Sequence, residues 1–424
     1  MHTPIINALN KYNDRETLRF HMPGHKGKTG FPLDVTELPD TDNLSAPEGA
    51  IAEALSLASV AFGSRQTYFL TGGSTSGNLA MLTSVAADGD TVIIDRACHI
   101  SVFSALTLCG ATPIYMHPDY KHGIAMPPTP QKVSDALSEN PTAKCVFITS
   151  PNAFGFTADV KAIADICHTF GVPLLVDEAH GAHFAFSPLL PPTAMESGAD
   201  MCVQSAHKTL PALTGSAMLH LSNLKYASRL ADAVHLYQST SPSYLLMASI
   251  DYARAFMQEE GEEKLAQLIE WINKYKTPNV LDTDDITKIV VDCPGFSHKK
   301  IVPESTSPQN TVFISTVCDS EQDIKELFEA INELPAAFLS FITPPAAETV
   351  ISPKAAYLLT GATICLDDAE GRVSKKSVYC YPPAVPIIAP GEIITHEAID
   401  YIHTMQAQGC EVHGIQNGNI NIII

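Results

Sequence analysis

Residues 174–181 have the sequence Leu-Leu-Val-Asp-Glu-Ala-His-Gly, and residues 203–209 have the sequence Val-Gln-Ser-Ala-His-Lys-Thr. The first segment is a short apolar run that ends in polar residues, and the second gives the polar end of the apolar run 201–203, as expected where a buried strand leaves a sheet. The interval between Asp177 and Lys208 leaves room for the crossover connection that joins two parallel strands. We therefore expect both side chains at the carboxyl edge of one open α/β sheet, where such folds gather their functional groups.

The same pattern repeats on either side of these two segments, because short β-rich runs alternate with helical stretches from about residue 66 to 221. One connecting helix is predicted to begin after an N-cap at Thr157 and to end at Gly171. This alternation is typical of a mostly parallel sheet flanked by helices. The predicted strands are 67–70, 91–94, 112–115, 145–148, 173–176, 201–203 and 216–219.

The rest of the chain predicts further domains. A Pro/Gly/Ser-rich stretch follows the strand 288–291, and the strand 312–315 precedes an amphipathic helix, as in a smaller α+β domain. We expect a large α/β domain and a smaller C-terminal domain, preceded by an N-terminal segment. Their predicted bounds are 1–50 for the segment, 51–280 for the large domain and 281–424 for the C-terminal domain.

The composition of the 424 residues argues against some partners and sites. A net charge of −20 would repel nucleic acid phosphates. The first ten residues lack a basic stretch followed by an apolar region, and no apolar run approaches the ~20 residues that span a bilayer. We therefore expect a cytoplasmic protein without membrane or nucleic acid partners. The ten cysteines form no Cys-x-x-Cys pair of the kind found in zinc or redox motifs.

A Ser/Thr/Gly-rich segment follows the first predicted strand, at residues 71–78, and leads into an apolar helix. Glycines let backbone N–H groups approach a ligand, and a helix N-terminus favours an anion, so a phosphate fits here. A Ser/Thr-capped loop without a ligand is the alternative for this segment taken alone.

Three residues at other strand ends complement this segment. Asp177 follows an apolar run and would be costly to bury without a cationic partner, such as a protonated pyridine nitrogen. Lys208 is placed to form a Schiff base, and His99 follows another strand, where its ring could stack on an aromatic cofactor. A phosphate cradle, a carboxylate and an amine on one rim meet the needs of pyridoxal 5′-phosphate (PLP). A metal site at His180, His183 and Glu178 is disfavoured, because the spacing lacks the His-Glu-x-x-His arrangement.

A series of motifs, in this order along nearly the whole chain, resembles the ornithine/lysine/arginine decarboxylases of PLP fold type I. The motifs lie at Phe20–Gly27, Thr36–Asp40, Asp42–Leu44, Gly73–Asn78, His99–Ser101, Asp177–His180, Ser205–Lys208, Ser239–Tyr244, Tyr381–Pro386 and Pro390–Glu392.

The resemblance implies that the protein is a cytoplasmic lyase of polyamine biosynthesis that decarboxylates a basic amino acid: arginine, lysine or ornithine. Lys208 would carry PLP as a Schiff base, Asp177 would pair with the pyridine nitrogen, and His99 would stack on the ring. His180 is a further cofactor-binding and catalytic candidate. The remaining cofactor-binding candidates would hold phosphate groups: Ser74, Ser76, Thr75, Ser205 and His207 in one subunit, and Ser239 or Thr240 toward its neighbour. The active unit would then be a homodimer or a higher homo-oligomer with active sites at the subunit interface.

Glu392 and Asp42 are the candidates for binding the substrate cation. The chain departs from the family in having Ala384 where Gly is usual, and His180 where some members have an aromatic residue. Its first motif starts within thirty residues of Met1, so we expect a short form without the receiver-like N-terminal domain of the large members.

Two alternatives remain at this stage. A fold type I aminotransferase, or another PLP enzyme acting at Cα, would use the same cofactor site, and Arg372 is then the candidate for the substrate carboxylate. A non-catalytic PLP-binding protein is the other alternative.

Overall fold

The computed structural model describes residues 1–424 except 16, 294, 308, 335–341 and 381–384. The chain folds into two compact units, each built from segments that are distant in sequence. The first unit comprises Met1–Ser84, Leu175–Leu268 and Thr316–Cys318, and the second comprises Val85–Leu174, Ile269–Ser315 and Asp319–Ile424.

Among the described residues, no helix combines the length and the apolar character that crossing a membrane requires.

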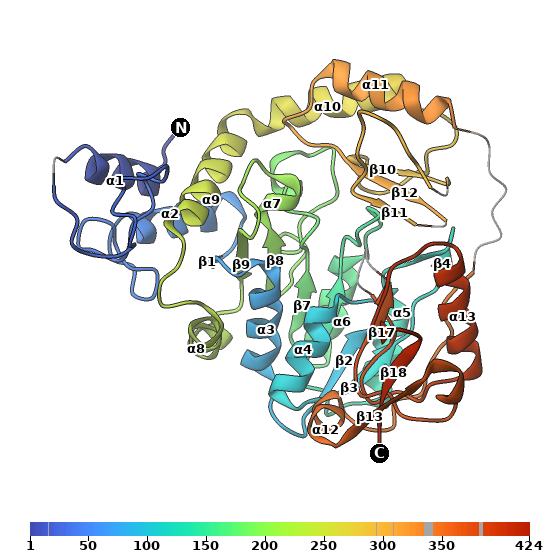
Figure 1. The fold of residues 1–424 in the computed structure, drawn as a ribbon. Helices are drawn as coiled ribbons and strands as arrows, with labels where there is room; N and C mark the ends of the chain where they lie inside the picture. The colour runs from blue at the N-terminus through green and yellow to red at the C-terminus, as the bar shows by residue number, and fades with distance from the viewer. Residues whose placement is uncertain (16, 294, 308, 335–341, 381–384) are drawn as a thin grey trace. The chain divides into compact units, whose positions relative to one another are not determined.

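The first unit contains strands in the order β1-β9-β8-β7, with β7 and β8 parallel and β9 antiparallel to both β8 and β1. Figure 1 shows β9 and β8 side by side. The backbone register pairs Asp177 with Val203, so the ends of β7 and β8 lie next to each other. The strands are β1 (Gln66–Leu70), β7 (Leu174–Asp177), β8 (Met201–Ser205) and β9 (Ala217–Leu221).

Helix α3 (Gly73–Val85) packs closely against these strands, and Gly77 is the reason that it can. A Cβ atom on Gly77 would lie 2.4 Å from Cγ2 of Val203 and 2.9 Å from Cδ1 of Leu70. The first turn of α3 is therefore seated directly beside the ends of β1 and β8. The other helices that begin in this unit are α1 (Pro4–Asn13), α2 (Ala50–Ala61), η1 (Phe184–Phe186), α7 (Ala206–Thr209), η2 (Leu224–Tyr226), α8 (Ala227–Tyr237), α9 (Tyr244–Phe256), the π-helical turn η3 (Met257–Gly261) and α10 (Glu262–Tyr275).

The second unit contains three parallel strands in the order β6-β2-β3. Helix α6 corrects one sequence prediction. Its N-cap is Asp159, whose side chain accepts a hydrogen bond from the Ala162 N–H, whereas Thr157 donates from its N–H and its hydroxyl to Asp284. The elements are β2 (Thr91–Asp95), β3 (Thr112–Met116), β6 (Val146–Thr149), α4 (Ile100–Cys109), α5 (Pro130–Glu139), α6 (Val160–Thr169) and the hairpin of β4 (Tyr120–Lys121) and β5 (Ile124–Ala125).

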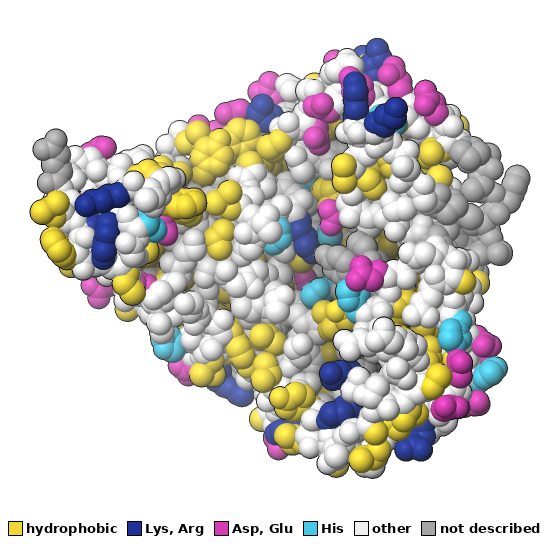
Figure 2. Space-filling view, viewed as in Figure 1, with side chains coloured by type: hydrophobic (Ala, Val, Ile, Leu, Met, Phe, Trp, Pro, Cys, Tyr) yellow, Lys and Arg dark blue, Asp and Glu magenta, His cyan; other side chains and the backbone are white. Residues whose placement is uncertain are grey.

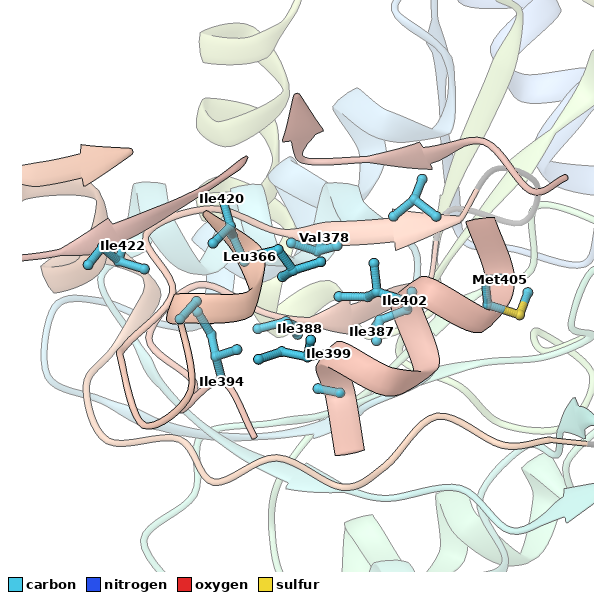
Figure 3. Packing of buried hydrophobic residues seen from close by; sticks show 13 residues of the cluster. Leu366, Val378, Ile387, Ile388, Ile394, Ile399, Ile402, Met405, Ile420 and Ile422 are labelled. Carbon is cyan, nitrogen blue, oxygen red and sulfur yellow. The ribbon is translucent and has the colours of Figure 1, made fainter. Parts of the chain in front are cut away.

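Three small antiparallel sheets and a hydrophobic core complete the second unit. Figure 3 shows Ile399 and Ile402 of α13 beside Ile387 and Ile388 of β15, within this core. The elements are β10 (Lys288–Val291), β11 (Ser305–Thr306), β12 (Thr311–Ile314), α11 (Glu321–Asn332), α12 (Pro353–Leu358), β13 (Gly361–Cys365), η4 (Leu366–Asp368), β14 (Val378–Cys380), β15 (Pro386–Ile388), α13 (His396–Ala407), β16 (Val412–His413), β17 (Ile415–Gln416) and β18 (Asn419–Ile423).

The predicted α/β class is confirmed. Each of the seven runs predicted as strands in residues 66–221 is a strand, with ends that differ by at most two residues. The pairing is mostly parallel within these strands, and the antiparallel pairs involve β9.

Candidate active site

Asp177 ends β7 as a buried carboxylate, with 3% of its surface exposed. Its Oδ2 accepts a hydrogen bond of 2.7 Å from the side-chain amide of Asn78, and its Oδ1 accepts one of 3.1 Å from the Ala179 N–H. Both donors are neutral, so they orient the carboxylate without cancelling its charge. Such a group is suited to hold a cationic partner in a buried position.

Lys208 lies in the short helix α7, directly after β8, and is half-buried. Its Nζ is 2.9 Å from Nε2 of His180, which lies three residues beyond Asp177. The ammonium form of Lys208 donates in this hydrogen bond, and a neutral His180 accepts. The structure thus brings together the amine and the histidine that the sequence predicted at two separate strand ends.

Residues 73–78 of the Ser/Thr-rich segment form the start of α3, and Thr71 and Gly72 precede the helix. The hydroxyl groups of Ser74 and Ser205 are 2.5 Å apart, which joins this turn to the end of β8. Ser76 is buried and donates to the Gly73 carbonyl, while Thr75 is exposed. The first backbone N–H groups of an α-helix have no partners within the helix, so the start of α3 offers an anion its amides as well as the Ser74 hydroxyl.

His207 is half-buried, one residue before Lys208. Its Nδ1 donates to the Ser216 carbonyl oxygen at 2.8 Å, which fixes the ring. Nε2 is then the ring nitrogen that remains for a phosphate.

Ser239 and Thr240 are exposed just beyond the end of α8. The residue before them, Gln238, accepts a hydrogen bond from the Thr71 N–H and donates to the Phe69 carbonyl, so it ties this segment to the end of β1. Their predicted contact with the phosphate of a neighbouring subunit stays a prediction.

His99 belongs to the second unit, where it is the N-cap of α4. Its Nδ1 accepts a hydrogen bond from the Ser101 N–H and lies 2.9 Å from the Ser101 hydroxyl. The ring is therefore held by its own helix, and its predicted stacking on a cofactor stays a prediction.

Glu392, the first candidate for the substrate cation, is completely buried and already has a cationic partner. Its Oε1 and Oε2 each accept a hydrogen bond of 2.8 Å from Arg96, and Oε2 also accepts from the Ala389 N–H. The Arg96 guanidinium also donates to the Pro386 carbonyl and lies over the ring of Tyr115. This pairing gives Glu392 a structural role within the second unit.

Asp42, the second candidate, is also used by the protein itself. Its carboxylate accepts hydrogen bonds from five backbone N–H groups between residues 43 and 52, among them that of Ile51 in the first turn of α2. Partial burial by itself would raise the pKa of Asp42, but the hydrogen bonds from Glu48 and its neighbours outweigh burial and lower the pKa. Asp42 therefore caps α2.

Asn78 and Glu178 are two buried residues for which the sequence predicted no role in the cofactor site. A role for Asn78 could have been predicted, because Ser74 and Asn78 are four residues apart and so lie on one face of α3. Glu178 is 2% exposed; it accepts hydrogen bonds from the Gln204 side chain and from the Ala194 N–H, both at 2.7 Å. Burial raises the pKa of Glu178 to about 8. No local sequence signal identifies its partners.

The alternatives find less support in the geometry. Among the described residues, no group of three or more His, Cys, Asp or Glu side chains is arranged to hold a metal ion. Arg372, the carboxylate-binding candidate for an aminotransferase, is exposed. Ala384, where the family usually has Gly, lies outside the described residues.

Comparison with known sequences gives matches over most of the chain. A family model described as the Orn/Lys/Arg decarboxylase major domain matches residues 3–294, and one described as the C-terminal domain of Orn/Lys/Arg decarboxylase matches residues 336–418. An arginine decarboxylase of Bacillus subtilis is 32% identical, with 99% of this chain and 97% of that protein covered. An arginine decarboxylase of Bacillus anthracis is 33% identical, with 97% of this chain and 94% of that protein covered.

Comparison with solved structures confirms PLP fold type I, the expected fold. The constitutive lysine decarboxylase of Escherichia coli matches with a TM-score of 0.83 at 19% sequence identity. The match covers 100% of this chain and 82% of that chain.

Proposed function

The chain belongs to the Orn/Lys/Arg decarboxylase family, a family of amino acid decarboxylases, and on this premise we propose that it uses PLP, held by Lys208, to convert a basic amino acid into its amine and CO₂. Relatives named arginine decarboxylase over nearly the full chain make arginine the first substrate to test, before lysine and ornithine. The observation that carries the proposal is the arrangement in the first unit, where the Lys208 amine lies beside His180 and the buried Asp177 carboxylate ends the strand next to it.

The residues of the first unit fit PLP by their chemistry. Ser74, Ser205 and the N-terminal amides of α3 would hold the phosphate, with His207 as a further donor. Asn78 lies one turn further along α3 and orients Asp177, which suits the protonated pyridine nitrogen. One helix would thus serve both polar ends of the cofactor.

When bound, PLP supplies an electron sink for the electron pair that remains after CO₂ leaves. Asp177 would keep the proton on the pyridine nitrogen, because a buried carboxylate stabilises a neighbouring cation. The amine of Lys208, which would hold the cofactor, or His180 at 2.9 Å from it, would be placed to deliver the proton that replaces the carboxylate at Cα. His99 would stack on the cofactor ring.

We further propose a homodimer, in a cytoplasmic protein, in which Ser239 or Thr240 reaches the phosphate of the neighbouring subunit and residues 1–50 contribute to the contact. Two observations support a contact through this segment. Phe20 is 89% exposed and Leu18 80% exposed. At the left of Figure 2, hydrophobic side chains also reach the surface around a group of Lys and Arg side chains. The amine would be available for polyamine synthesis.

The test is the visible absorbance of the purified protein with added PLP. We expect an absorbance band that borohydride abolishes and that Lys208→Ala lacks, while the exposed control Lys225→Ala retains it. Incubation with arginine, lysine and ornithine should release CO₂ and the matching amine. A protein that gains no band with PLP would contradict the cofactor assignment, and a keto acid product would favour the aminotransferase alternative.

A further inference from the structure

A row of polar side chains crosses the four strands of the first unit, in the order Glu178, Gln204, His220, Thr67 and Ser64. We call it the polar ladder. The Gln204 amide donates to Oε2 of Glu178 at 2.7 Å, and Oε1 of Gln204 lies 3.1 Å from Nε2 of His220. Nδ1 of His220 lies 2.9 Å from the Thr67 hydroxyl, which is 2.8 Å from the Ser64 hydroxyl. The first four members are at most 2% exposed.

The first three contacts of the polar ladder each join one strand to the next, and the Thr67–Ser64 contact lies at the start of β1. Glu178 directly follows β7, and its N–H donates to the Val203 carbonyl of β8 at 2.9 Å. Gln204 lies on β8, and His220 lies on β9 opposite both Cys202 of β8 and Thr67 of β1. The ladder therefore holds the side chains of all four strands in one register, in addition to the backbone hydrogen bonds.

The polar ladder and the candidate active site contact different helices. Asp177 is bound by Asn78 of α3. The His220 ring, in contrast, stacks on Phe62, the residue that ends α2, with 5.0 Å between ring centroids. Successive side chains of a strand point to opposite faces, so Glu178 and Gln204 support the strands from the face opposite to Asp177 and Ser205.

Stability alone does not explain polar residues at these positions. Buried polar groups must be fully hydrogen-bonded to avoid a desolvation cost, and apolar side chains of similar volume are often at least as stable. A fully satisfied buried network instead selects one arrangement of its strands over shifted ones. Here the selected arrangement is the offset between the ends of β7 and β8.

That offset matters because the ladder adjoins the candidate active site along the backbone. Glu178 directly follows Asp177, and Gln204 directly precedes Ser205, four residues before Lys208. We propose that Glu178 and Gln204 are positioning residues, whose hydrogen bond fixes the Asp177 carboxylate relative to Ser205 and Lys208. This inference rests on the proposed function of Lys208 and Asp177. A misplacement of about 1 Å at such groups is expected to cost on the order of 100-fold in rate.

The test compares Gln204→Met, which breaks the ladder beside β7, with Thr67→Val, which breaks it two strands away. In the PLP-loaded enzyme, Gln204→Met should lower kcat by about tenfold or more with little change in KM, and it should shift the absorbance band. Thr67→Val should leave kcat and the band unchanged. In the cofactor-free protein, the backbone amides of residues 178–180 and 205–208 should exchange hydrogen faster in Gln204→Met than in Thr67→Val.

Glu178→Gln is the conservative variant. If the Gln204 amide reverses its ends and His220 takes its other neutral tautomer, the polar ladder and the Ala194 N–H keep their hydrogen bonds with a neutral amide at residue 178. We expect kcat and amide exchange close to those of the wild type. If Gln204→Met does not fold, Gln204→Asn, which is too short to span both contacts, takes its place with the same expected result.

Wild-type kcat, band and amide exchange in Gln204→Met would overturn the inference, and so would equal losses in Gln204→Met and Thr67→Val. Failure of the proposed function looks different, because the wild type itself would then show no PLP band and no decarboxylation.

Discussion

The two most buried of the carboxylates predicted to act in catalysis or substrate binding, Asp177 in the first unit and Glu392 in the second, differ in what surrounds them. Asp177 accepts hydrogen bonds from two neutral groups, the Asn78 amide and the Ala179 N–H. Glu392 is bound through both oxygens by the Arg96 guanidinium. The first environment orients a negative charge, whereas the second compensates it.

This difference distinguishes a carboxylate that is available to a ligand from one that the protein itself uses. Burial is costly for either carboxylate, and an internal ion pair is one solution to that cost. The neutral donors to Asp177 orient its carboxylate and would leave it to pair with a cationic ligand. Asp42 adds a third case, since its oxygens are taken by backbone N–H groups that begin α2. Three variants test this comparison.

Asp177→Asn should have the largest effect. It keeps the size of the side chain but removes the charge that would stabilise a protonated pyridine nitrogen, so we expect kcat/KM to fall at least ~1,000-fold, about 4 kcal/mol of barrier. Asp200→Asn is the matched control, because Asp200 is a buried aspartate that directly precedes the first residue of β8, at the end away from Ser205. Steady-state decarboxylation of arginine by both PLP-loaded variants measures the difference. If Asp177→Asn and Asp200→Asn had similar activities, Asp177 would have no special role in catalysis.

Glu392→Gln should act on stability rather than on chemistry. It leaves the buried Arg96 charge uncompensated, and we expect the free energy of unfolding to fall by about 3 kcal/mol. Urea unfolding measures this loss, and the double variant with Arg96→Met and Glu392→Leu should recover part of it. A Glu392→Gln protein of normal stability with a raised KM for arginine would instead restore the predicted role in substrate binding.

Asp42→Asn should have the smallest effect. We expect the free energy of unfolding to fall by about 1 kcal/mol at pH 7, because an amide cannot accept hydrogen bonds from all the N–H groups that the carboxylate binds. The pKa of Asp42 is lower in the folded protein than in the unfolded chain. Its contribution is therefore complete above the unfolded pKa of about 4 and is lost as the pH falls through the folded pKa. Thermal unfolding should be measured at pH 7 and below pH 4. The difference in stability between Asp42→Asn and the wild type should be smaller in acid. A constant difference would argue against the charged cap, and a raised KM at unchanged stability would support substrate binding.

Much of the candidate site is encoded locally. The runs predicted at 173–176 and 201–203 are the strands 174–177 and 201–205, and Ser74, Ser205, His180 and Lys208 form contacts at their ends. Local prediction failed where a competing partner lay far away in sequence, as for Thr157, which binds Asp284 instead of capping α6.

The α/β class, the strands, the family resemblance and the lysine could be predicted from the sequence, because apolar periodicity and motif spacing are properties of neighbouring residues. Which carboxylates are available depends on tertiary contacts. Arg96 and Glu392 form their hydrogen bonds across 296 positions of the sequence. The contact of Asn78 with Asp177 spans 99 positions, and that of His220 with Thr67 in the polar ladder spans 153. Hydrogen-bond partners of buried groups are chosen by packing, and packing joins residues whose order along the chain carries no record of the contact.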